Sequence, residues 1–201
     1  MTSSSMVHHV DASMRVIAGK YRSRPLRSMR GMDIRPTADR LRETLFDVLT
    51  AGNPAALEGT VWIDLYAGTG AVGIEALSRG AAMVYFVESS AGPAELIKNN
   101  LQSLGITTGF EILRMDTGRA LKNLEASGIC ADHVFLDPPY RMEEAYADTL
   151  NALSHSRLLK PESLIIAEHQ KKFDPGEMFA GLSRYRKLVQ GDAALSFFRR
   201  V

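Results

Sequence analysis

From residue 60 onward, short runs of apolar residues alternate with longer segments in which apolar residues recur at helical spacing. Each short run is mostly apolar on both faces, which is typical of a strand buried inside a parallel sheet. The predicted strands are 61–65, 83–87, 110–114, 132–136 and 163–168. The predicted helices are 71–79, 91–104, 117–127 and 143–153. This alternation predicts an α/β fold with a doubly wound sheet.

The pattern changes towards both ends of the chain. Residues 184–190 and 194–200 read as two further strands. Gly191 and Asp192 between them are typical of a hairpin turn, so we expect an antiparallel final strand and a mixed sheet. Residues 14–29 also read as two short strands, which predicts a small N-terminal hairpin.

A helix is expected between this hairpin and the main sheet. It should begin after Arg35, because Leu41, Leu45 and Val48 repeat at helical spacing. The first residues are small and polar, which predicts a disordered leader. The predicted organisation is a leader over 1–13, a basic hairpin and helix over 14–54, and the main domain over 55–201.

Charge is distributed unevenly along the chain. The net charge is +1, but residues 15–42 hold nine basic residues and two acidic ones, so this window carries +7 and the rest carries −6. We call residues 15–42 the basic arm. A basic segment on an acidic body predicts a polyanionic partner, and the alternative is a solvated surface segment. The residues predicted to contact RNA are Arg15, Lys20, Arg22, Arg24, Arg27, Arg30, Arg35 and Arg40.

Composition excludes several classes of protein. Hydrophobic residues make up 45% of the chain, which argues against a mainly disordered protein. No apolar run is long enough to span a membrane. The single cysteine, Cys130, excludes an internal disulfide and a cysteine-built zinc site, and we expect it to be a buried structural thiol. We therefore expect a cytoplasmic protein that needs neither a membrane nor a metal.

The first chemical motif lies between the first predicted strand and the first predicted helix. Gly68, Gly70 and Gly73 match the G-x-G-x-x-G pattern of nucleotide-binding loops. Glu88 follows Gly68 by 20 positions, where a carboxylate can bind both ribose hydroxyls; the alternative is a surface acid at a helix start. The pattern leaves a nicotinamide dinucleotide and S-adenosylmethionine open. Asp64 favours S-adenosylmethionine, because an acid beside the loop suits an ammonium group.

A third acidic residue follows the third predicted strand. Asp116 could accept a hydrogen bond from the exocyclic amine of an adenine. It could equally cap the helix that begins at residue 117, and the sequence leaves both interpretations open.

The second motif is Asp137-Pro138-Pro139-Tyr140, directly after the fourth predicted strand. The two prolines fix the backbone and remove two N–H donors, so a carboxylate and bare carbonyl oxygens remain. Such an array can only accept hydrogen bonds and suits an amino group that must attack through its lone pair. Tyr140 offers a flat face on which a base can stack. The alternative is a rigid turn without chemistry.

Together the two motifs resemble a class I S-adenosylmethionine-dependent amino-methyltransferase. Further segments are similar to the RsmD family of 16S ribosomal RNA guanine-N2 methyltransferases, namely 14–22, 35–46, 75–81 and 194–198. The resemblance covers about residues 14–200 and leaves the leader outside. It implies a seven-stranded mixed sheet with an N-terminal extension.

The resemblance also implies a site. The implied cofactor residues are Asp64, Tyr66, Gly68, Gly70, Glu88 and Asp116, with Tyr66 where the family often has phenylalanine. The implied catalytic residues are Asp137, Pro138, Pro139 and Tyr140. The implied substrate is the N2 amine of a guanine in 16S ribosomal RNA, within the small subunit or its assembly intermediate, and we expect the enzyme to be a monomer.

Other functions remain open at this point. An adenine-N6 DNA methyltransferase uses the same Asp-Pro-Pro-Tyr chemistry, although this chain has little room for a target-recognition domain. A nicotinamide-dependent oxidoreductase or a non-catalytic nucleotide- or RNA-binding protein would also fit the glycine-rich loop. His169 is expected at the ligand edge of the fifth strand, in a structural or phosphate-contacting role.

Overall fold

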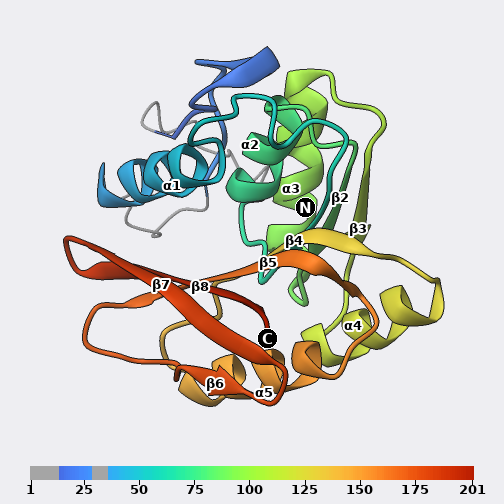
Figure 1. Ribbon diagram of the computed structural model, residues 1–201. Helices are drawn as coiled ribbons and strands as arrows, with labels where there is room; N and C mark the ends of the chain where they lie inside the picture. Colours follow the sequence, from blue (N-terminus) through green and yellow to red (C-terminus); the bar gives the residue numbers. More distant parts are fainter. Residues whose placement is uncertain (1–13, 29–35) are drawn as a thin grey trace, which may run out of the picture.

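The computed structural model describes residues 14–28 and 36–201, and within them eight strands form one mixed sheet (Figure 1). The strand order is β3-β2-β1-β4-β5-β8-β7-β6. The strands are β1 (Val61–Leu65), β2 (Met83–Val87), β3 (Phe110–Leu113), β4 (Ala131–Leu136), β5 (Leu159–Gln170), β6 (Met178–Phe179), β7 (Leu182–Gln190) and β8 (Ala193–Arg200). The predicted α/β class and doubly wound sheet are confirmed.

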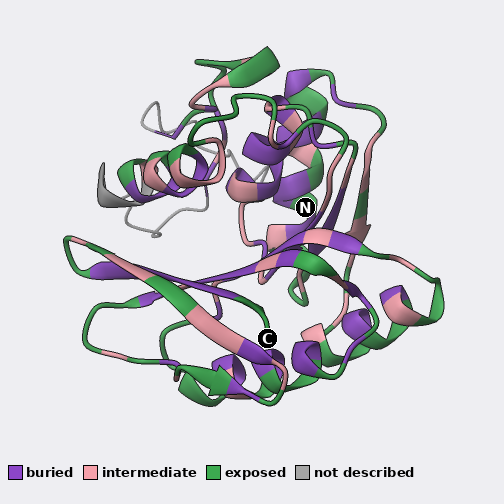
Figure 2. Cartoon of the chain, in the orientation of Figure 1, coloured by how far each residue is buried: buried purple, intermediate pink, exposed green. Residues whose placement is uncertain are grey.

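Five α-helices within the described residues cover the two faces of the sheet (Figure 1). They are α1 (Pro36–Leu49), α2 (Ala71–Ser78), α3 (Ala91–Leu104), α4 (Thr117–Ala126) and α5 (Glu143–Ser154). Helices α1, α2 and α3 pack on one face through a buried cluster that includes Trp62, while α4 and α5 pack on the other through a cluster that includes Ile63 (Figure 2). Successive residues of β1 thus enter opposite halves of the core, as strand geometry requires.

The C-terminal half of the sheet is antiparallel. β8 lies between β5 and β7 and pairs antiparallel with both, and Gly191 turns the β7–β8 hairpin with a φ of 61°. The predicted hairpin and antiparallel final strand are therefore confirmed. The eighth strand, β6, was not expected: it contains two residues and forms a tight hairpin onto the start of β7.

The predicted N-terminal hairpin is present, but without two regular strands. Its single β-bridge joins Arg15 and Pro25, and the N–H groups of Leu26, Val16 and Ser23 donate across it to the carbonyl oxygens of Met14, Arg24 and Val16. A short 3-10 turn, η1 (Gly19–Tyr21), lies between the two sides. The backbone N–H groups of Ile17 and Ala18 donate to Glu75 of α2, so the body of the protein also holds the segment.

Two further observations concern the surface. Cys130 is exposed, so the expectation of a buried thiol is wrong. It lies just before β4, where the chain leaves a surface turn at Gly128. In the parts of the chain that the structure describes, no helix is long and apolar enough to cross a membrane.

Candidate active site

Four carboxylates come from neighbouring strands at one edge of the sheet. Because β1, β2, β4 and β5 run parallel, their carboxyl ends meet there. Asp64 lies in β1, Glu88 follows β2, Asp137 follows β4 and Glu168 lies near the end of β5. This edge of the sheet therefore gathers acidic side chains around the glycine-rich loop.

The backbone of the loop adopts conformations that suit glycine. Gly68 and Gly70 have φ of 55° and 77°, and Tyr66 before them has a φ of 61°, which is uncommon for a residue with a side chain. A Cβ at Gly73 would lie 2.3 Å from the ring of Phe86, so this glycine lets α2 pack closely on β2. The three glycines thus have the roles expected of a nucleotide-binding loop.

Glu88 connects the loop to the next turn. Its Oε2 accepts a hydrogen bond from the Gly68 backbone N–H at 3.0 Å, and its Oε1 accepts one from the Ser90 N–H at 2.8 Å. The structure therefore brings Glu88 to the loop, as its spacing predicted. Because Glu88 already accepts from the Gly68 N–H, that donor is not directed at a pyrophosphate.

Asp64 is buried beneath the loop. Its Oδ2 accepts a hydrogen bond from the Gly73 N–H at 2.9 Å, which supports the first turn of α2. The pKa of Asp64 is raised to about 8, mainly by burial and to a smaller extent by the negative charges of Asp137 and Glu88, while the hydrogen bond from Gly73 acts in the opposite direction. A nearby cation would favour the ionised form, so a contact with an ammonium group stays a prediction that the geometry permits.

Asp116 caps a helix. Its Oδ1 accepts a hydrogen bond from the backbone N–H of Arg119 at 2.9 Å, at the start of α4. This is the capping role that the sequence left open. The side chain is exposed, and a contact with adenine remains a prediction.

The Asp137–Tyr140 motif presents acceptors at the same edge. Burial raises the pKa of Asp137 to about 7, so its carboxyl group can exchange a proton near neutral pH. The Tyr146 hydroxyl donates to the Glu168 carbonyl oxygen at 2.7 Å and lies 3.5 Å from the carbonyl oxygen of Pro138. Since a hydroxyl has one proton, the shorter contact takes it and the Pro138 oxygen keeps its accepting capacity. Tyr140 is 45% exposed.

Glu168 is a residue that sequence analysis did not assign to the site. Leu136 pairs with Ala167, so the next residues along the two strands, Asp137 and Glu168, are neighbours. Burial raises the pKa of Glu168 well above its usual value, and the charge of Asp137 adds to that effect. The only signal in the sequence was an acid at the end of a predicted strand.

Arg42 acts electrostatically on this acidic edge. Its positive charge lowers the pKa of Glu168 and so opposes the effect of burial. It is 6% exposed and donates from Nη2 to the Arg15 carbonyl oxygen at 2.6 Å and to Asp39 at 3.1 Å. Arg42 therefore belongs to the core where α1 packs against Arg15, and not to a surface that could bind RNA.

His169 does not face a ligand. Its side chain is fully buried, and Nε2 lies 2.9 Å from the Ser196 hydroxyl. It also packs edge-on against Tyr146 and Phe173. The phosphate-contacting interpretation of His169 is wrong, and the structural one describes what its contacts do.

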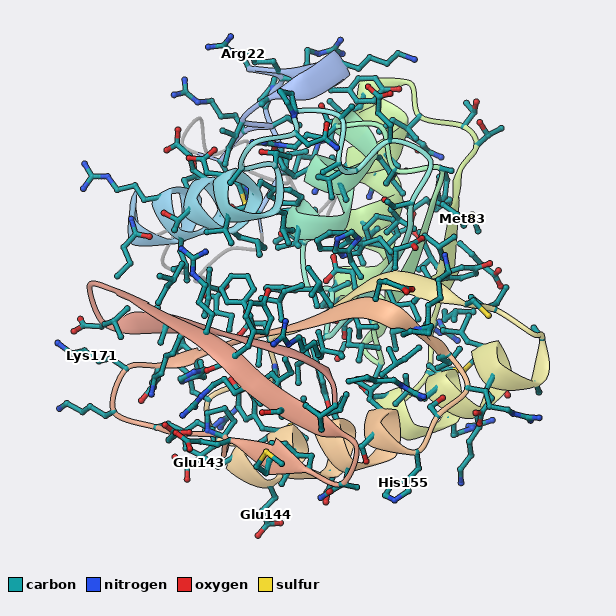
Figure 3. All side chains as sticks on the ribbon, viewed as in Figure 1. Arg22, Met83, Glu143, Glu144, His155 and Lys171 are labelled. Carbon is teal, nitrogen blue, oxygen red and sulfur yellow. The ribbon has the colours of Figure 1, made fainter. Side chains whose placement is uncertain are left out.

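The basic arm presents most of its described charge to solvent. Arg15, Lys20, Arg22, Arg24 and Arg40 are exposed and Arg27 is half-buried, while Arg30 and Arg35 lie outside the described residues. Figure 3 shows Arg22 projecting away from the body at the end of the molecule where the arm lies. A hollow of about 510 Å³ lies between residues 15–23 of the arm and the first turns of α1. It is lined by Arg15, Ile17, Arg22, Ser23, Asp39, Arg40 and Glu43.

The acceptor groups at this edge fit a cationic nucleoside better than a dinucleotide. The loop faces carboxyl groups, and burial raises the pKa values of two of them, Asp64 and Asp137, to about 8 and about 7. A pyrophosphate would make their ionisation still less favourable, whereas a sulfonium or ammonium group would favour their ionised forms. The geometry thus favours S-adenosylmethionine over a nicotinamide dinucleotide.

Comparison with known proteins gives consistent results. Residues 14–199 match the model of the family described as Conserved hypothetical protein 95. The chain is 31% identical over 187 residues to "Putative rRNA methyltransferase YlbH" of Bacillus subtilis, covering 93% of this chain and 99% of that one. It is 32% identical to "Ribosomal RNA small subunit methyltransferase D" of Escherichia coli, covering 96% and 93%.

Solved structures resemble the whole fold. The structure of "Putative methyltransferase yhhF" from Escherichia coli superimposes with a TM-score of 0.77 at 29% identity, covering 93% of this chain and 97% of that one. The structure described as "Crystal structure of SMU.776, a putative methyltransferase complexed with SAH" has a TM-score of 0.64 at 14% identity, covering 83% of this chain and 50% of that one, which shows a shared fold. The similarity therefore extends over nearly all of the chain and is not limited to the motifs.

Proposed function

The chain belongs to the family described as Conserved hypothetical protein 95, and on this basis we propose that it methylates the exocyclic N2 amine of a guanine in 16S ribosomal RNA. It is a methyltransferase that uses S-adenosylmethionine. The relatives named as small-subunit ribosomal RNA methyltransferases support the choice of RNA. The base, its position and the form of the small subunit that is modified belong to the proposal.

One observation supports the reaction above all others: the acceptor motif and the nucleoside loop lie at the same sheet edge. Leu65 at the end of β1 pairs with Leu136 at the end of β4, so the chain segments that follow, the loop and the Asp137–Tyr140 motif, begin side by side. A methyl donor held by Gly68, Gly70 and Glu88 would thus adjoin an amine held by Asp137. Proximity of this kind accounts for much of the rate in group transfer.

Bound S-adenosylmethionine would supply a methyl group activated by a sulfonium. The protein's part is to prepare the nitrogen that attacks it. The amine would donate its hydrogens to Asp137 and to the Pro138 carbonyl oxygen, which leaves its lone pair free. As the new N–C bond forms, the bond between the methyl carbon and sulfur would break and S-adenosylhomocysteine would leave as a neutral thioether. The nitrogen would lose one proton, and Asp137 would accept it. Tyr140 would stack on the base and offset part of the cost of removing it from its helix.

The basic arm and its hollow support a polyanionic substrate. The hollow is lined by three arginines, Arg15, Arg22 and Arg40, and by two acidic residues of α1, Asp39 and Glu43. Three guanidinium groups around one concavity suit the phosphates of a folded RNA backbone. The proposed RNA-binding surface is therefore the arm together with the exposed side of α1.

The direct test is methylation of small ribosomal subunits isolated from a strain that lacks this gene, with radiolabelled S-adenosylmethionine and mapping of the modified base. The proposal expects label in 16S ribosomal RNA as N2-methylguanine. Label on adenine in DNA would replace the proposal with the N6 alternative. Binding of NADH without binding of S-adenosylhomocysteine would instead indicate an oxidoreductase.

Glu88→Ala is expected to weaken S-adenosylmethionine binding by about 1–3 kcal/mol, because a charge-assisted hydrogen bond to the ribose is lost together with the contact that steadies Gly68. Titration calorimetry measures this change. Glu95→Ala is the matched control, since Glu95 is an exposed acid on α3 in a long ion pair with Lys98 at 3.9 Å. An unchanged dissociation constant in a folded Glu88→Ala variant would refute the ribose role.

Reversing the three arginines of the hollow to glutamate is expected to flatten the salt dependence of RNA binding. Each phosphate contact with single-stranded RNA contributes about 0.7 to the slope of log K against log salt, so the loss of three should reduce it by about two. Reversing the exposed residues Lys122, Arg157 and Arg186 changes the net charge equally and is the control. A slope equal to that of the wild type, with intact thermal melting, would leave the hollow without a role in RNA binding.

A further inference from the structure

Asn100 connects the glycine-rich loop to the basic arm. It lies in the last half of α3, and its side chain is fully buried. Its side chain forms a hydrogen bond with Thr69, which lies between the two left-handed glycines of the loop. The same side chain forms hydrogen bonds with Arg27 in the arm. No other part of the reaction scheme described above uses this residue.

The amide of Asn100 is nearly saturated with hydrogen bonds. Its Nδ2 donates to the Thr69 carbonyl oxygen at 3.0 Å and to the Arg27 carbonyl oxygen at 3.1 Å, which uses both of its protons. Its Oδ1 accepts from the Arg27 N–H at 2.8 Å. All three partners are backbone groups, so the side chain fixes the path of the chain in both segments. A movement of either segment must break bonds to the other or carry it along.

A second contact joins the same two segments. The Thr69 hydroxyl lies 3.9 Å from Sδ of Met14, and the Met14 carbonyl oxygen accepts a hydrogen bond from the Leu26 N–H at 2.9 Å. Met14 and Leu26 are both buried in the cluster that lies under α2 and α3. The base of the arm therefore rests directly on the cofactor loop.

We propose that Asn100 couples binding of the cofactor to binding of RNA, so that occupation of the cofactor site raises the affinity of the basic arm for RNA. The inference rests on the proposed function, because it takes the loop as the cofactor site and the arm as the RNA site. A nucleoside that contacts Gly68 and Glu88 restricts the loop, and Asn100 transmits that restriction to Arg27. RNA then binds an arm that is already restricted, so its binding costs less conformational entropy.

The coupling is measured on the wild-type protein with small-subunit ribosomal RNA transcribed in vitro. We expect saturating S-adenosylhomocysteine to tighten RNA binding by about fivefold or more, and RNA to tighten S-adenosylhomocysteine binding by the same factor, since linkage is reciprocal. A ratio of one in the wild type overturns the inference whatever any variant does.

Asn100→Ala is expected to bring this ratio close to one. The control is Asn99→Ala, which removes a neighbouring amide that makes no side-chain hydrogen bond within the described residues and should keep the wild-type ratio. A merely structural role for Asn100 predicts weaker binding of both ligands with an unchanged ratio, and that result would contradict the coupling.

Hydrogen exchange gives a readout that needs neither RNA nor activity. Adding S-adenosylhomocysteine to the wild type should slow exchange in the loop and also at Val16, Leu26 and Arg27, whose N–H groups hold the arm together. Protection confined to the loop would overturn the inference. If S-adenosylhomocysteine does not bind at all, the proposed function itself fails and the coupling fails with it. If reversing the hollow arginines leaves RNA binding unchanged, the arm is not the RNA site, which overturns the coupling while the proposed function stands.

Discussion

Replacing Asp137 with alanine is expected to lower the single-turnover rate by about 10²- to 10⁴-fold, the range typical of a lost acid–base group, while the affinity for S-adenosylmethionine changes little. The reason is positional: in the proposed mechanism Asp137 adjoins the amine to be methylated, whereas the cofactor would be held by the loop and Glu88, which Gly68 joins through its N–H. Rapid-quench methylation and titration calorimetry separate the two effects. A near-normal single-turnover rate in the variant would remove Asp137 from the mechanism.

Asp137→Asn refines this result through its pH dependence. The ionised carboxylate is the form that accepts a proton, and burial raises the pKa of Asp137 to about 7. The wild-type rate should therefore rise as the pH passes upward through about 7 and level off above it. The asparagine variant keeps a hydrogen-bond acceptor but has no group that ionises there, so its slower rate should lack this rise. A rise of the same size in both enzymes would assign the titration to another group.

Glu75→Ala is expected to lower the free energy of unfolding by about 3–5 kcal/mol, as is typical when one partner of a buried ion pair is removed. Glu75 is fully buried and accepts hydrogen bonds from the Ile17 and Ala18 N–H groups at 2.7 and 2.9 Å and from Arg79 Nε at 2.8 Å. The variant leaves two backbone donors and a guanidinium without their acceptor. Urea denaturation measures the change.

The matched control for this prediction is Glu162→Ala, because Glu162 is an exposed acid in β5. Its effect should stay within about 0.5 kcal/mol, as for most surface substitutions. A loss below about 1 kcal/mol in Glu75→Ala would mean that the arm can leave the body without unfolding it. The arm would then be a detachable segment, contrary to the burial of Met14, Val16 and Leu26 beneath it.

The strands of the sheet were predictable because each is encoded locally. Residues 61–65 and 83–87 agree in full with β1 and β2, since a parallel strand covered on both faces needs an unbroken apolar run. β5 is longer than expected and begins at Leu159. Its first part contains Lys160 and Glu162, and it pairs with Ala131 across an irregular register that no local pattern could show.

The arm and part of the site were not predictable for the same physical reason. Besides its local backbone hydrogen bonds, the arm is held by Glu75 and Asn100, which lie more than 50 residues away in the chain. The loop and the Asp137 motif could be found because their chemistry is contained in consecutive residues. Glu168 could not, because its relevance depends on the register of β4 against β5, which places it beside Asp137.

The exposure of Cys130 has a practical consequence. The thiol lies just before β4, whereas Asp137 follows the other end of the same strand. Six residues of strand span about 20 Å, so a dye attached by thiol alkylation would lie well away from the chemistry while remaining anchored to a rigid sheet. Because the sequence has one cysteine, alkylation yields a single labelled species. The native chain thus already contains a unique attachment point from which fluorescence polarisation can follow its association with RNA.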